Sequence, residues 1–156
     1  MKKQQRVLIE NIQPQINCGE FPIKRVVNEL VHLQADVLAD GHDVLQAAII
    51  IEAPDTKEKA EHRLTAEYND TYFGQFIVKK QGYYTYYIEA WIDHALNWQH
   101  GIEAKLKDGQ HVKSELLHGI QYLEYLHRKV KSKDDKSYLS DLQSLFQSEK
   151  EYDKAV

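Results

Sequence analysis

Histidines are the side chains in this sequence whose number first suggests metal chemistry. The chain has eight, and His111, His118 and His127 fall on one expected helix at spacings of seven and nine residues. Protein zinc sites draw their ligands from short spacings such as His-Glu-x-x-His, which this sequence lacks. Solvated or partly packed histidines explain the pattern better. The sequence therefore predicts no metal site and no cofactor.

The segment Asp40-Gly41-His42-Asp43 brings two carboxylates close together in the sequence. A hard cation needs about six oxygen ligands, and this segment offers too few for a closed site. Aspartate side chains also stabilise turns through hydrogen bonds to nearby backbone, which explains the same residues. We expect a hairpin-like turn here.

A second pair of carboxylates, Glu89 and Asp93, lies on one face of an expected strand. Four residues of strand separate them by about 13 Å, at ~3.3 Å per residue. That is too far for the paired carboxyl groups of a glycosidase. The sequence also lacks a Gly-x-Ser-x-Gly motif, a phosphate-binding loop and a dinucleotide fingerprint. It predicts that this chain alone is not an enzyme.

Aromatic side chains offer a different chemistry. Six of the ten tyrosines fall between Tyr68 and Tyr87, and exposed aromatic rings are natural platforms for sugar rings. Packing within a sandwich, with the hydroxyl groups reaching water, explains most of them. We favour packing because strand alternation already accounts for Tyr84 and Tyr86, and a sugar-binding surface remains the alternative.

Length and charge bound the classes of function. The 156 residues suffice for one sandwich and an appendage. A net charge of -4 gives no reason to expect a nucleic acid or an anionic membrane as a partner. Cys18 is the only cysteine, which favours a reducing, cytoplasmic compartment. The apolar run at 7–9 is cut off by Glu10 and is too short for a signal peptide, and no run reaches membrane-spanning length.

The stretch 82–93 is the one around which the first part of the chain is organised. Gly82 suits the positive φ of a tight turn. The residues that follow are aromatic or β-branched, and alternation places Tyr84, Tyr86 and Ile88 on a core face. The order Gly82-Tyr83-Tyr84 is similar to the tyrosine corner of immunoglobulin-type sandwiches. We interpret 82–93 as a central sandwich strand.

Other segments with strand patterns are spaced by turn signals, which favours a sandwich. The run at 45–51 is apolar throughout and fits either a strand buried on both faces or a buried helix. Proline near the start of 21–27 is typical of an edge strand. The remaining expected strands are 6–12, 31–37, 61–68 and 72–78.

The spacing becomes helical after Asp93. Asn97 is the expected cap of a first helix that ends near Gly109. A second helix covers 112–130, and a third follows the polar break at 132–135. We therefore expect a mainly β fold with added α structure, with an immunoglobulin-like β-sandwich over 1–94 and a segment of about three helices over 95–156. The apolar stripes of these helices need a partner, which is the sandwich, one another or a second chain.

Several short motifs occur in a specific order: 6–11, 19–27, 35–37, 40–43, 69–70 and 84–93. In this order they resemble the N-terminal domain of bacterial α-1,4-glucan:maltose-1-phosphate maltosyltransferases, which belong to the α-amylase clan of glycoside hydrolases. The resemblance spans roughly 6–98 and continues as a helical pattern. Tyr72 departs from it, since relatives often have tryptophan there, and 53–68 matches poorly.

The resemblance implies an immunoglobulin-like domain with a helical insertion from Asn97, and a catalytic barrel beyond Val156. The parent enzyme would transfer maltosyl from maltose 1-phosphate to an α-1,4-glucan. It implies a non-catalytic role here, in homodimer formation and in contact with the catalytic domain of the same parent chain. The positions that match the family at this interface are Phe21, Lys24, Arg25, Asp40, His42, Asp43, Trp91, Asp93 and Trp98. A stand-alone glucan-binding module is the alternative function, and an adaptor that binds proteins through its helices is a third.

Overall fold

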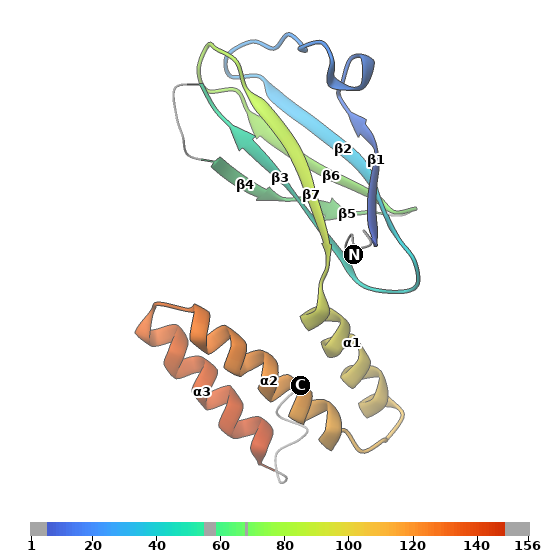
Figure 1. Ribbon diagram of the computed structural model, residues 1–156, viewed down its shortest axis with the longest axis vertical. Coiled ribbons are helices and arrows are strands. Elements are labelled where there is room, and N and C mark those ends of the chain that lie inside the picture. The colour runs from blue at the N-terminus through green and yellow to red at the C-terminus, as the bar shows by residue number, and fades with distance from the viewer. Residues whose placement is uncertain (1–5, 55–58, 68, 149–156) are drawn as a thin grey trace, which may run out of the picture. The chain divides into compact units, whose positions relative to one another are not determined.

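The computed structural model describes residues 6–54, 59–67 and 69–148. The chain divides into two compact units, Met1–Asp93 and His94–Val156. Strands build the first unit, called here the sandwich unit, and helices build the second, called the helical unit (Figure 1).

Two antiparallel sheets form the sandwich unit within the described ranges. The first sheet has the strand order β1-β2-β6-β5, and the second has the order β4-β3-β7. If β2, β3 and β7 correspond to strands B, C and F, the first sheet has the A-B-E-D order of an immunoglobulin-like sandwich. The bounds are β1 Val7–Gln13, β2 Leu30–Ala39, β3 Leu45–Glu52, β4 Lys59–Arg63, β5 Thr65–Ala66, β6 Thr71–Ile77 and β7 Thr85–Ile92.

Side chains of alternate residues from both sheets meet in one core. Four alternate residues of β2 are buried, Val31, Leu33, Ala35 and Val37, while the residues that alternate with them are more exposed, as the pattern predicts. Ile49 and Ile51 of β3 face them from the other sheet in the same cluster. The predicted immunoglobulin-like sandwich is confirmed.

The apolar run at 45–51 is a strand, which excludes the helical interpretation. β3 is the middle strand of its sheet and pairs with β4 and with β7. Its outward residues Ala48 and Ile50 are buried as well as its inward residues. Burial on both faces explains why this segment shows no alternation.

Two segments that the sequence predicts to be strands do not form as predicted. The segment 21–27 forms only a single bridge, between Ile16 and Phe21. The backbone N–H of Val26 donates to Oε2 of Glu29 at 2.8 Å, a local bond that competes with strand pairing. Where one strand was expected at 61–68, the chain forms β4 and β5 in different sheets, and Tyr68 lies outside the described residues.

The expected hairpin-like turn at 40–43 is wrong, because the flanking strands do not pair with each other. β2 pairs with β1 and β6, whereas β3 pairs with β4 and β7. The turn carries the chain from one sheet to the other. Alternation shows which face of a strand is buried but leaves open whether its partner lies beside it or across the core.

The tyrosine corner is present. The hydroxyl group of Tyr84 accepts hydrogen bonds from the backbone N–H groups of Lys79 and Lys80, at 3.2 and 3.1 Å. Gly82 has the expected positive φ, 140°. The hydroxyl therefore holds the turn that leads into β7.

Replacing Tyr84 by phenylalanine is expected to destabilise the sandwich unit by about 0.5–1.5 kcal/mol, because two backbone donors lose their acceptor. Urea unfolding monitored by circular dichroism measures the change. Tyr83→Phe is the matched control, because the Tyr83 side chain is 85% exposed. Equal losses in the two variants would contradict a structural role for the Tyr84 hydroxyl.

β7 is not the central strand that the sequence suggests. It begins at Thr85 rather than at Gly82, and it pairs with β3 alone within the described ranges. A strand rich in aromatic and β-branched residues is typical of a sheet interior, so its position at the margin is a finding that the sequence does not predict.

Three helices form the helical unit, as predicted: α1 His94–Lys107, α2 Lys113–Lys129 and α3 Lys133–Gln147. Asn97 lies inside α1, so the expected cap at this residue is wrong. Ser132 caps α3, and its hydroxyl accepts from the backbone N–H of Asp135. None of these helices is long and apolar enough to cross a membrane. Their shared core consists of Ile102, Val112, Leu116, Ile120, Leu123 and Phe146.

Candidate functional site

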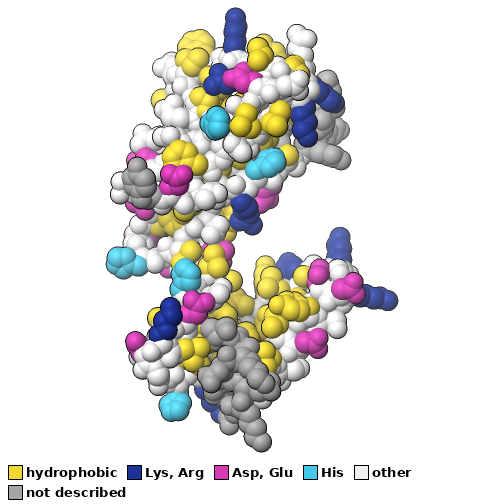
Figure 2. Space-filling view, turned by 180° about the vertical axis from the view of Figure 1, so that it is seen from behind, with side chains coloured by type: hydrophobic (Ala, Val, Ile, Leu, Met, Phe, Trp, Pro, Cys, Tyr) yellow, Lys and Arg dark blue, Asp and Glu magenta, His cyan; other side chains and the backbone are white. Residues whose placement is uncertain are grey.

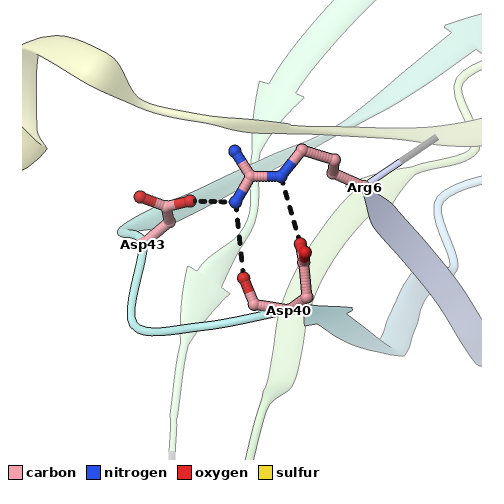
Figure 3. A network of polar contacts seen from close by, with 3 residues as sticks. All are labelled: Arg6, Asp40 and Asp43. Atoms are coloured by element: carbon pink, nitrogen blue, oxygen red, sulfur yellow. Dashed lines mark hydrogen bonds and ion pairs between the residues drawn. The ribbon is translucent and has the colours of Figure 1, made fainter. Parts of the chain in front are cut away.

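Asp40 and Asp43 lie in the connection between β2 and β3, where both contact Arg6 (Figure 3). Nε of Arg6 donates to Oδ1 of Asp40 at 3.1 Å, and Nη2 donates to Oδ2 of Asp43 at 2.8 Å. These hydrogen bonds, that to Asp40 first, raise the pKa of Arg6 above its usual value. The two aspartates are thus occupied by an arginine, which ties the start of β1 to the turn. His42 is exposed beside them.

Phe21, Lys24 and Arg25 lie together in the connection between β1 and β2, and all three are exposed. Nη1 of Arg25 donates to the carbonyl oxygen of Lys24 at 2.8 Å, and its Nε lies 3.4 Å from Oε1 of Glu29. These local contacts hold the arginine near the backbone. Phe21 remains 54% exposed, so this connection presents an apolar ring to solvent.

Trp91 and Tyr87 lie on the outer face of the second sheet, and each ring has a cation near it. The guanidinium carbon of Arg63 lies 4.5 Å from the centroid of the Trp91 ring, and Nζ of Lys59 lies 5.2 Å from that of Tyr87. Lys59 also pairs with Glu52 at 2.7 Å, and hydrogen bonding to Glu52 raises the lysine pKa. A sugar ring that stacks on the same face of Trp91 would have to displace Arg63.

Asp93 follows β7, and its backbone N–H donates to the carbonyl oxygen of Val44 at 2.8 Å. This bond extends the β3–β7 ladder by one residue. Asp93 and Trp91 are therefore neighbours, as the sequence predicts, and the three residues between Glu89 and Asp93 continue the extended strand as far as Ile92.

Trp98 belongs to the core of the helical unit. Its Nε1 donates to the carbonyl oxygen of Glu115 at 2.6 Å, and its ring centroid lies 5.6 Å from that of Phe146. Both rings cover Gly119, where a Cβ would lie 2.5 Å from Trp98 and 2.8 Å from Phe146. The side chain packs α1 against α2 and α3.

Glu115, at the start of α2, has the most perturbed carboxylate among the described residues of this unit. Its side chain accepts a short hydrogen bond from Nζ of Lys105 and another from the hydroxyl of Ser114. The bond from Lys105 is the main cause that lowers the pKa of Glu115 to about 2. A negative charge at a helix N-terminus is also favourable.

This pKa predicts a dependence of stability on pH. A carboxylate whose pKa is about 2 in the folded state and 4.5 as a model value stabilises the fold above pH 4.5. That contribution is lost as the pH falls from 4.5 towards 2. Comparing the melting temperature of the chain with that of Glu115→Gln between pH 6 and pH 2.5 measures it. The difference between the two proteins should shrink on acidification, and a constant difference would contradict the assignment.

The described residues contain no group of three or more histidine, cysteine, aspartate or glutamate side chains that could hold a metal ion. One open groove of about 360 Å³ lies between α2 and α3, lined by Glu124, His127, Arg128, Ser140 and Gln143. Its glutamate already accepts a hydrogen bond from Gln143 at 3.4 Å. Nothing in it forms a convergent catalytic arrangement.

The predicted interface residues thus lie in separate parts of the fold. The sequence analysis did not predict the residues that contact them. Arg6 binds Asp40 across 34 residues, and no local spacing connects the two. The register of β1 against β2, which pairs Val7 with Ala39, brings them together. Arg63 reaches Trp91 across β3 in the same way, through strand pairing.

These features define a class: an immunoglobulin-like sandwich joined to a helical unit, with surface residues engaged in ion pairs and cation–π contacts. Comparison with known proteins identifies the particular family. The model of domain N/S of α-1,4-glucan:maltose-1-phosphate maltosyltransferase matches residues 5–156. The chain belongs to this family.

Curated relatives of the same name agree with the family model. The protein from Salinibacter ruber is 35% identical over 128 residues, which cover 79% of this chain and 19% of the relative. The protein from Picrophilus torridus is 32% identical over 142 residues, which cover 87% and 22%. That from Corynebacterium glutamicum is 30% identical over 148 residues, which cover 89% and 22%. The chain therefore spans about a fifth of the length of these relatives.

Proposed function

We propose that this chain is a non-catalytic domain of a maltosyltransferase, which supports the catalytic part of the enzyme and contributes to a homodimer. The parent reaction is the transfer of maltosyl from maltose 1-phosphate to an α-1,4-glucan, in a cytoplasmic enzyme of the α-amylase clan. The observation that carries the proposal is the match over residues 5–156 to domain N/S of that family, within a fifth of the relatives' length.

The side chains of the described residues support a role in assembly. Aspartates near the β2–β3 connection are held by Arg6, and the carboxylate of Glu115 is held by Lys105. Carboxylates engaged in this way stabilise a fold and are poorly suited to act as a nucleophile or an acid. The single cysteine, Cys18, is exposed and free, which favours a reducing compartment.

The helical unit offers an apolar surface for a dimer. Leu117 and Tyr125 on α2 are 55% and 56% exposed, and they lie about 80° apart around the helix, so one partner can contact both; we call them the α2 surface. Hydrophobic side chains are visible among charged ones in the space-filling view (Figure 2). Interfaces favour aromatic and aliphatic side chains of this kind over lysine and glutamate. We assign this surface to the contact with a second copy.

Sedimentation equilibrium of the chain and of Leu117→Glu/Tyr125→Glu tests the dimer. We expect the unchanged chain to dimerise and the double variant to be a monomer, because a buried unpaired carboxylate opposes association. Ala104→Glu adds charge at an exposed position of α1 and is the control. If the unchanged chain sediments as a monomer, the proposed dimerisation is wrong.

Titration with maltooligosaccharides distinguishes a supporting role of this domain from the alternative role in glucan binding. Arg63 covers one face of the Trp91 ring, so we expect the tryptophan fluorescence to stay unchanged. Arg63→Ala uncovers Trp91 and serves as the comparison. A saturable change in the unchanged chain that is lost in Trp91→Ala would favour the glucan-binding alternative.

A further inference from the structure

The groove between α2 and α3 is lined only by side chains that form hydrogen bonds. Its volume is about 360 Å³. α2 contributes a carboxylate, an imidazole and a guanidinium group, and α3 contributes a hydroxyl and an amide group. The two helices lie side by side and are joined by the short link between Lys129 and Lys133 (Figure 1). A groove without an apolar side chain suits a small polar ligand better than an apolar helix.

Several of these groups keep hydrogen-bonding capacity for a ligand. Nε of Arg128 donates to the backbone carbonyl oxygen of Glu124 at 3.2 Å, and Nε2 of Gln143 donates to Oε1 of Glu124 at 3.4 Å. Among the described residues, neither Nη atom of Arg128 and neither ring nitrogen of His127 has a hydrogen-bond partner. The second carboxylate oxygen of Glu124 is unpartnered in the same sense. The groove therefore offers both donors and an acceptor.

The segment 128–136, which joins the two helices beside the groove, is strongly basic. It contains five cationic and two acidic side chains, a net charge of +3, in a chain whose net charge is -4. Elsewhere in the described ranges, Arg6, Lys59 and Lys105 form close ion pairs. The cations of 128–136 form none with any described residue. Their charge is thus available to an anion.

Helix electrostatics account for only some of these cations. Arg128 and Lys129 lie in the last turn of α2, where a positive charge is favourable. Lys131 lies in the link, and Lys133 is the first residue of α3, where the partial positive charge of the helix N-terminus disfavours a cation. The acidic pair at 134–135 offsets that charge in part. The stability of the two helices therefore does not explain the lysines at the start of α3.

Cations beside a groove of hydrogen-bonding groups suit an anion that also carries hydroxyl groups. A guanidinium group binds the oxygens of a phosphate group through charge-assisted hydrogen bonds. The carboxylate of Glu124 repels a bare anion but accepts hydrogen bonds from hydroxyl groups, and the amide of Gln143 can donate or accept. We propose that this groove binds the phosphate ester of a small hydroxylated molecule, a sugar phosphate, with its phosphate group at Arg128 and its hydroxyl groups at Glu124 and Gln143. This inference goes beyond the proposed function and does not depend on the proposed dimer.

Titration of the 156-residue chain, followed by the NMR resonances of its backbone amides, tests the site. The probes are glucose 1-phosphate, inorganic phosphate and glucose, at one ionic strength because salt screens the cations. Glucose 1-phosphate should shift the resonances of 124–143 to saturation and bind about tenfold more tightly than either other probe, because it engages both parts of the groove. Equal affinity for inorganic phosphate or for glucose would overturn the proposal, and so would the absence of saturation.

Three variants with unchanged spectra before titration locate the site. Arg128→Gln should weaken the binding of glucose 1-phosphate by about tenfold, because it removes the charged donor. Glu124→Ala should narrow the difference between glucose 1-phosphate and inorganic phosphate, because it removes a hydroxyl acceptor. Lys107→Gln removes a charge at an exposed position of α1 outside the groove and is the matched control. Equal weakening in Arg128→Gln and Lys107→Gln would show non-specific attraction and overturn the proposal, as would an unchanged difference in Glu124→Ala.

Discussion

Replacing Ile49 by alanine is expected to lower the free energy of unfolding of the sandwich unit by about 2–5 kcal/mol, because it removes buried methyl groups and leaves a cavity. Ile49 is 0% exposed, and it pairs with Ile88 across the β3–β7 ladder. Its side chain lies in the cluster that joins the two sheets. The total stability of a domain is about 5–15 kcal/mol, so this loss is a large part of it.

Urea unfolding followed by near-ultraviolet circular dichroism measures this effect. Ile77→Ala on β6 is the control, because Ile77 is 50% exposed and its truncation should change stability by only about 0.5 kcal/mol. Similar losses in both variants would contradict a core role for Ile49. The transition of the helical unit should stay in place, since its core shares no residue with that of the sandwich.

Ile102→Ala is the second substitution that we expect to lower the free energy of unfolding strongly, and it lies in the helical unit. Ile102 on α1 is 0% exposed and packs in the cluster with Val112 and Leu116. We expect a loss of about 2–5 kcal/mol. Folded domains have a total stability of only about 0.05–0.15 kcal/mol per residue, so a small unit has little stability to lose. The variant should therefore unfold this unit at temperatures where the sandwich unit is still folded.

Thermal unfolding followed at 222 nm, where helices dominate the signal, detects this result. Tyr138→Ala on α3 is the control, because its side chain is largely exposed. One shared transition that moves equally in Ile49→Ala and Ile102→Ala would show that the two units unfold together, and it would contradict independent cores.

Local patterns in the sequence determined most of the strands and all three described helices. Alternation identified the buried face of β2, and helical spacing identified α2 and α3, since both patterns depend on residues that are close in the chain. The tyrosine corner was also predictable, because the Tyr84 hydroxyl binds backbone only four and five residues away.

Only the tertiary structure decided which elements meet. It placed β2 and β3 in different sheets, brought Arg6 to Asp40, packed Trp98 against Phe146 of α3 and left β7 at a sheet margin. A periodic pattern shows which face of an element is apolar, and many partners can cover the same face. The choice among them depends on strand register and on packing between residues far apart in the chain, which no local spacing contains.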